Sequence, residues 1–132
     1  MEAVAQELDM KQATPGQMVF WYDPKPEQGS ENPKAGVVDQ VGGELIHLEL
    51  LDGSKVEVLN QEIMPVMPAD NGNFPFIGVL LGVSENHTVE IGEFSVDAKT
   101  PETARQRIIN QGWEERYRMN GLSPKVVDLS ID

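Results

Sequence analysis

Apolar and polar side chains alternate with a period of two between Gln17 and Leu59, and glycine-containing turns interrupt the alternation. This pattern predicts strands that bury one face, because successive side chains of a strand point to opposite faces. Gly42-Gly43 and Asp52-Gly53 are expected to form hairpin turns. We therefore predict a closed, mostly antiparallel small β-barrel. Its expected strands are residues 17–22, 34–41, 44–51, 54–59 and a short closing strand at 62–66.

The order of these strands and loops resembles that of the SH3-like barrels, including the Tudor and KOW-type modules. The resemblance covers roughly residues 15–67 and is one of pattern. It implies an SH3-like barrel at 15–68, after a polar N-terminal arm at 1–14, and a ligand held by aromatic side chains near the long loop. A shared fold does not identify that ligand. The residues that carry the resemblance are Gly16-Gln17-Met18-Val19, the loop 23–33, Lys34-Ala35-Gly36-Val37-Val38 and the two hairpins.

Residues 69–132 predict an appendage in which two strands, a helix and a last strand follow one another. The whole chain is therefore expected to be α+β and mainly β. Thr100 is a good N-cap before Pro101, and we expect a helix over about 101–119 that Gly112 ends or kinks. Gly92 is expected to mark a β-bulge, because the apolar alternation changes phase there. In the last strand the spacing places Val127, Leu129 and Ile131 on one face.

Acidic side chains dominate the first three quarters of the sequence. Residues 1–97 carry a net charge of −13 and residues 98–132 a net charge of +1, within a total of −12. Because an acidic surface repels phosphates, nucleic-acid binding through this body is unexpected. Two interpretations of the charge stay open: it keeps the protein soluble, or it binds a basic partner.

The sequence also favours a soluble protein of a reducing compartment. It has no cysteine, which excludes disulfides and thiolate metal sites. Its start lacks the basic and apolar segments of a secretory signal, and its longest apolar stretch, Phe74–Val83, is about half a membrane span. We expect a cytoplasmic protein without membrane contact, located in the host cytoplasm or the virion if it is viral.

Motifs for enzymatic chemistry are absent from the sequence. It has no phosphate-binding glycine loop, dinucleotide fingerprint, nucleophile elbow or His-Glu-x-x-His pattern. We therefore predict no enzyme, and no catalytic, cofactor-binding or metal-binding residue. The alternative rests on His47 and Glu49, which share a strand face, but one such pair falls short of the three or four ligands of a zinc site.

Five residues are candidates for binding a partner: Trp21, Tyr22, Arg105, Trp113 and Arg116. Trp21 and Tyr22 stand beside the loop 23–33, and arginine is enriched at protein interfaces. The alternatives are that the aromatic residues pack in the core and that the arginines lie on a solvated helical face. Arg105 and Arg116 come close together only if the helix continues through Gly112.

The function expected from these features is that of a non-catalytic structural or protein-interaction protein. It would be an oligomeric or accessory subunit of a larger assembly, for example a virion or capsid decoration component, with a protein partner or self-assembly. The alternative is an acidic regulatory module that binds a basic or nucleic-acid-associated protein.

Overall fold

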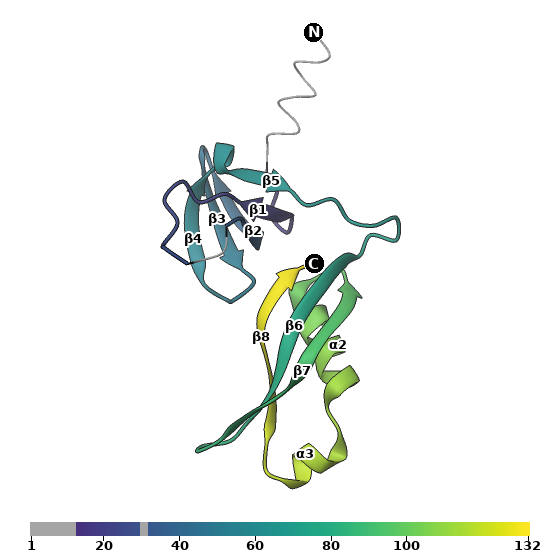
Figure 1. The fold of residues 1–132 in the computed structure, drawn as a ribbon. Helices are drawn as coiled ribbons and strands as arrows, with labels where there is room; N and C mark the ends of the chain where they lie inside the picture. Colours follow the sequence, from purple (N-terminus) through teal and green to yellow (C-terminus); the bar gives the residue numbers. More distant parts are fainter. Residues whose placement is uncertain (1–12, 30–31) are drawn as a thin grey trace. The chain divides into compact units, whose positions relative to one another are not determined.

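The computed structural model describes residues 13–29 and 32–132 (Figure 1). Most of the arm expected at 1–14 therefore lies outside the described residues. The protein is α+β and mainly β, as the sequence predicts. The chain divides into two compact units, Met1–Val66 (unit 1) and Met67–Asp132 (unit 2), so that the division falls two residues before the expected one.

Unit 1 contains a five-stranded antiparallel sheet with the order β4-β3-β2-β1-β5. A short 3-10 helix, Asn60–Glu62, connects β4 to β5. All five expected strands are present, and no end differs from the expected one by more than one residue. They are β1 (Met18–Trp21), β2 (Lys34–Gly42), β3 (Leu45–Leu50), β4 (Lys55–Leu59) and β5 (Ile63–Pro65).

The core of unit 1 follows the period-two alternation. In β3 the side chains of Ile46, Leu48 and Leu50 are buried, as their spacing predicts, and Val58 of β4 joins them. Burial of aliphatic side chains stabilises a sheet by about 1.5–3 kcal/mol for each one. The buried cluster consists of Val19, Val38, Ile46, Leu48, Leu50 and Val58, with Ala13, Trp21, Val56 and Ile63 packed against it.

Both hairpin loops of unit 1 differ from the two-residue loops expected. The first loop is shifted by one residue, and the second is longer by one residue. Gly42 is the last residue of β2 and pairs with Leu45, so the first loop is Gly43-Glu44. Gly43 has φ +68°, as the first loop position of a type II′ turn requires. The second loop has three residues, because the amide of Gly53 donates to Leu50 O and that of Leu50 to Ser54 O.

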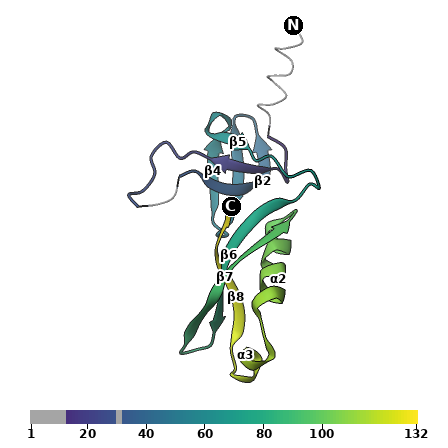
Figure 2. The same cartoon turned by 45° about the vertical axis from the view of Figure 1, so that its right-hand side comes forward.

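Unit 2 is a three-stranded antiparallel sheet with the order β7-β6-β8. Thr100 caps α2, since its hydroxyl accepts a hydrogen bond from the amide of Thr103, and Pro101 is the first helical residue, as expected. The helix α2 lies along one face of the sheet (Figures 1 and 2). The elements are β6 (Phe74–Val83), β7 (Thr88–Ala98), α2 (Pro101–Gly112), α3 (Glu115–Met119) and β8 (Ser123–Ile131).

Glycines allow α2 to approach the sheet closely. A Cβ at Gly78 of β6 would lie 3.0 Å from Ile108 Cδ1 of α2. A Cβ at Gly112 would lie 2.7 Å from Leu80 Cδ2 and 2.6 Å from Phe94 Cζ. Larger side chains at these two positions would push the helix away from the buried residues of β6.

Two β-bulges change the faces on which side chains lie. In β7 the extra residue is Ile91, next to the expected position at Gly92, because Leu80 pairs with Gly92 and Leu81 with Glu90. In β8 the register shifts around Asp128, which has a left-handed φ of +53°. The prediction for Val127 was therefore wrong: Val126 pairs with the buried Leu80 and lies on the helix side with Leu129.

The helix expected over 101–119 is two helices. α2 ends at Gly112, and Trp113 and Glu114 have extended backbone angles before α3 begins at Glu115. This break agrees with the expectation that Gly112 ends or kinks the helix. Arg105 and Arg116 therefore do not share one continuous helical face.

Candidate interaction surfaces

The aromatic residues of β1 divide between the two faces of the sheet of unit 1. Trp21 packs against the core, and its indole N–H donates to Glu62 Oε1 over 3.2 Å. The side chain of Tyr22 is 44% exposed, and its backbone N–H donates to Glu62 O. Phe20 pairs with Met64 of β5, and the Met64 side chain is 55% exposed. Trp21 is thus a partly buried core residue, while Tyr22 is available for contact.

His47 lies beside Glu57 of β4 and not beside Glu49, the carboxylate of its own strand that the sequence indicated. Its Nε2 lies 3.5 Å from Glu57 Oε2, directly across from it on β4. Glu49 lies opposite Lys55 instead. Within residues 13–29 and 32–132, no three His, Cys, Asp or Glu side chains come together as metal ligands.

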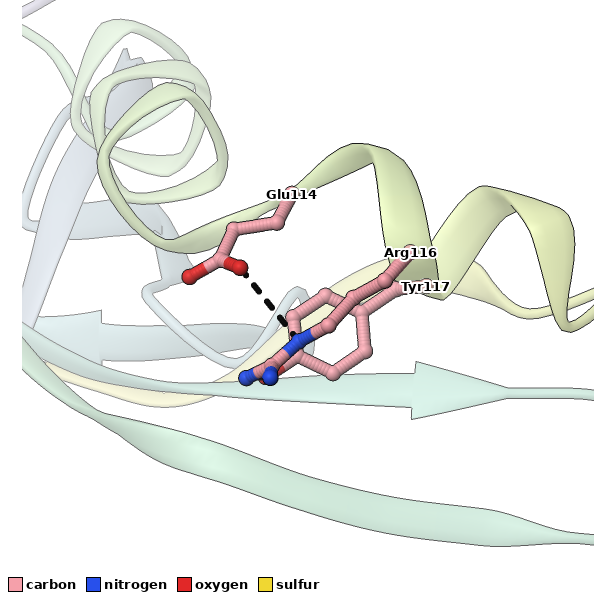
Figure 3. Close-up of polar contacts among 3 residues, drawn as sticks. All are labelled: Glu114, Arg116 and Tyr117. Carbon is pink, nitrogen blue, oxygen red and sulfur yellow. Dashed lines mark hydrogen bonds and ion pairs between the residues drawn. The ribbon is translucent and has the colours of Figure 1, made fainter.

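Arg116 lies in a small surface cluster with its neighbours (Figure 3). Its Nε is 3.3 Å from Glu114 Oε2, and its Nη2 donates to the Tyr117 hydroxyl over 2.8 Å. The hydrogen bond to Tyr117 and the nearby Glu114 carboxylate raise the pKa of Arg116 above its usual value. The guanidinium carbon also lies 4.8 Å from the centroid of the Tyr117 ring. The Arg116 guanidinium is therefore engaged by its own neighbours.

Trp113 is partly buried and lies between α2 and α3. Its ring centroid is 5.3 Å from that of Tyr117, and a Cβ at Gly82 would contact Trp113 Cζ3 at 3.5 Å. Arg105 is half-buried on α2 and Arg107 bonds the carbonyl of Asp97. The expected arginine surface is thus divided between two helices, and Trp113 contributes to packing at the end of the sheet.

The sheet of unit 2 has a different candidate surface. We call this surface the open face, and it is the side of β6, β7 and β8 opposite α2. Gly78 and Leu80 face the helix, because a Cβ at Gly78 would lie 3.0 Å from Ile108 Cδ1 and a Cβ at Gly112 would lie 2.7 Å from Leu80 Cδ2. Alternation along β6 then places the intervening residues on the other side. No element of unit 2 packs on that side (Figure 2). Its central, half-buried stripe is Ile77, Val79, Leu81 and Val83.

The flanks of the open face follow from the pairing register, because directly opposed residues of antiparallel strands share a face. On the β7 side the flank is largely acidic or polar, and on the β8 side it includes one lysine and one valine. The pairs across each β6 residue are Ser95 and Ser130 at Ile77, Glu93 and Val127 at Val79, Glu90 and Lys125 at Leu81, and Thr88 and Ser123 at Val83.

The open face was not predicted from the sequence. The ten-residue apolar stretch of β6 was visible, but its composition does not show which of its sides lies against a helix. The signal in the sequence is the alternation of Gly78 and Gly82 with bulky aliphatic residues, which marks one face for the close approach of α2. The composition of the flanks depended on the two bulges, which fix the register.

No family model, curated protein or solved structure matches the chain. In the part of the chain that the structure describes, no helix has the length and apolar character needed to cross a membrane.

Proposed function

We propose that the protein is a non-catalytic interaction protein, an accessory subunit of a larger assembly, and that the open face of unit 2 is its principal contact surface. The observation that carries this proposal is the aliphatic stripe of Ile77, Val79, Leu81 and Val83 on a sheet face that no element of its own unit covers. An apolar centre with a polar rim is the usual composition of a protein interface.

A decoration component of a virus particle is a concrete example of such a subunit. Proteins of this kind need surfaces that bind protein rather than a pocket that performs chemistry.

We further propose that unit 1 is an SH3-like module. The antiparallel order β4-β3-β2-β1-β5, in which the short closing strand returns to pair with β1, supports this assignment. The long loop between β1 and β2 also supports it, with its ends joined because the amide of Asp23 donates to Asn32 Oδ1 over 2.9 Å. Tyr22 stands at the start of that loop.

The test of the proposed function compares the native assembly of two variants with equal charge changes. Val79→Glu places a carboxylate in the centre of the open face, whereas Met119→Glu places one at an 81% exposed position of α3. Each tagged protein is purified from its native source, and co-eluting proteins are quantified by mass spectrometry. We expect Val79→Glu to lose the assembly and Met119→Glu to keep it. Equal retention by both folded variants would refute the proposal.

The second candidate function is an acidic regulatory module, and the charge of unit 1 favours it. Residues 1–66 contain twelve acidic and four basic side chains, a net charge of −8. Binding of a basic protein through this unit would weaken steeply between 50 and 300 mM salt, because salt screens exposed charges. Binding that is insensitive to salt would exclude this alternative.

A further inference from the structure

The flanks of the open face are nearly self-complementary. At the Ile77 rung both neighbours are serines, at Val83 they are threonine and serine, and at Leu81 they carry opposite charges. Lys125 and Glu90 are both exposed and stand on opposite sides of the same β6 residue. Among the four rungs from Ile77 to Val83, only that of Val79, with Glu93 and Val127, is unmatched; beyond them, the rung of Pro75 carries Asp97 on β7 and Asp132 after β8.

A two-fold axis parallel to β6, midway between two facing sheets, exchanges the flanks. It places β7 of one copy opposite β8 of the other and keeps each rung at the same height. Lys125 of each copy then faces Glu90 of its partner, and the aliphatic stripes meet in the centre. An axis perpendicular to the strands within the interface would instead place the acidic flank of β7 against itself, with like-charge repulsion.

We propose that the open face binds a second copy of this chain in this two-fold arrangement. This inference rests on the proposed function and names the partner of the same surface. A two-fold contact uses the same patch on both subunits and closes on itself. Two sheets that pack face to face keep their mean strand directions within about 30° of each other, and this axis keeps the β6 strands of the two copies aligned. The two Lys125–Glu90 pairs would then flank an apolar centre.

The dimer is expected to be weak, because each copy contributes only a dozen residues from three strands. Stable interfaces of standard size use about 20–30 residues from each partner. We expect a dissociation constant on the order of tens of micromolar. The test is therefore sedimentation equilibrium of the full 132-residue chain from about 5 to 500 µM, at 0.15 M salt to reflect physiological screening.

Charge reversal identifies the arrangement. Lys125→Glu and Glu90→Lys each create two like-charge pairs, and each is expected to weaken the dimer about tenfold. The double variant Lys125→Glu/Glu90→Lys restores two opposite-charge pairs and should return to the wild-type constant. The controls Lys99→Glu and Glu85→Lys make the same charge changes at exposed positions outside the open face and should leave the constant unchanged.

A gain of affinity provides a second readout that a folding defect would not imitate. Glu93 is the one carboxylate that this arrangement places opposite an apolar side chain, Val127 of the partner. Glu93→Thr removes the unmatched charge and keeps a good strand residue. We expect it to tighten the dimer several-fold.

Three results would overturn the inference: a monomer throughout the concentration range, reversals that act no more strongly than their controls, or a double variant that stays weak. If the wild type is monomeric while Val79→Glu still loses its native assembly, the second copy is excluded and the proposed function stands. If Val79→Glu keeps its assembly as well, both fail.

Discussion

At the scale of single residues, Gly112 determines how the helix meets the sheet of unit 2. It is the last residue of α2 and is buried, and the space for a side chain at this position is already occupied by Leu80 and Phe94. Leu80 is fully buried. The close contact of α2 with β6 therefore depends on the absence of a side chain here.

Gly112→Ala is expected to lower the free energy of unfolding by about 1–3 kcal/mol, since overpacking a core costs that much. Urea denaturation followed by circular dichroism measures the change. Gly42→Ala is the matched control, because a Cβ there meets nothing within 4 Å and the backbone is not left-handed. Equal stability of the two variants would contradict the packing described at Gly112.

The carboxyl group of Asp52 makes the stability of the protein depend on pH. The hydroxyl and the amide of Ser54 donate to Asp52 Oδ1 over 2.6 and 2.8 Å, and they lower the pKa of that carboxyl. The native state thus favours the ionised form, and the resulting stability is present above the unfolded pKa of about 3.9 and is lost as the pH falls through the lower native value.

The variant Asp52→Asn keeps an acceptor oxygen but removes the charge. At pH 7 we expect it to be less stable than the wild type by less than about 1 kcal/mol, because the site is exposed and screened. The difference should shrink as the pH falls from 4 to 2, in urea denaturation at each pH. A difference that stays constant or grows toward low pH would contradict the assignment.

At the scale of elements, the N-cap residue Thr100 fixes the start of α2. Thr100→Ala removes the acceptor for the Thr103 amide and is expected to cost about 1 kcal/mol of stability. Thr100→Ser keeps a hydroxyl acceptor and should cost much less. Thermal unfolding of both variants measures the difference, and an equal loss for alanine and serine would show that the cap does not contribute.

The sequence predicted the elements better than it predicted their register. Alternation and turn residues were sufficient to locate every strand of unit 1, the Thr100 cap and the effect of Gly112. The faces of β7 and β8 depended on bulges at Ile91 and Asp128, which tertiary pairing selects and local sequence barely marks. A phase change near Gly92 was visible, but nothing indicated the left-handed backbone of Asp128, so Val127 was assigned to the wrong face.

In the candidate site too, local alternation predicted the exposure of side chains, whereas contacts between distant strands were not predicted. Exposure of Tyr22 and burial of Trp21 follow from alternation once the strand is placed, but the bond from Trp21 to Glu62 joins residues 41 positions apart. The His47–Glu57 contact likewise depends on the pairing of β3 with β4. The open face was missed because one strand of ten apolar residues does not reveal which of its sides a helix covers.

At the scale of the whole molecule, the two units contribute different surfaces. Unit 1 carries most of the negative charge and a small aliphatic core built from β1 to β4, with Ile63 of β5 packed against it. Unit 2 has its helix on one side of a three-stranded sheet and, on the other, an aliphatic stripe that no element of unit 2 covers. Contact through unit 2 is therefore expected to depend on apolar burial, and contact through unit 1 on ionic strength.

The most direct test of the open face as the interaction surface is methyl NMR of the full chain, recorded over a dilution series. Association through the open face predicts concentration-dependent shifts for Ile77, Val79, Leu81, Val83 and Val127, with those of Val19, Val38 and Val58 in the core of unit 1 unchanged. Invariant spectra of the stripe, or shifts confined to unit 1, would contradict it.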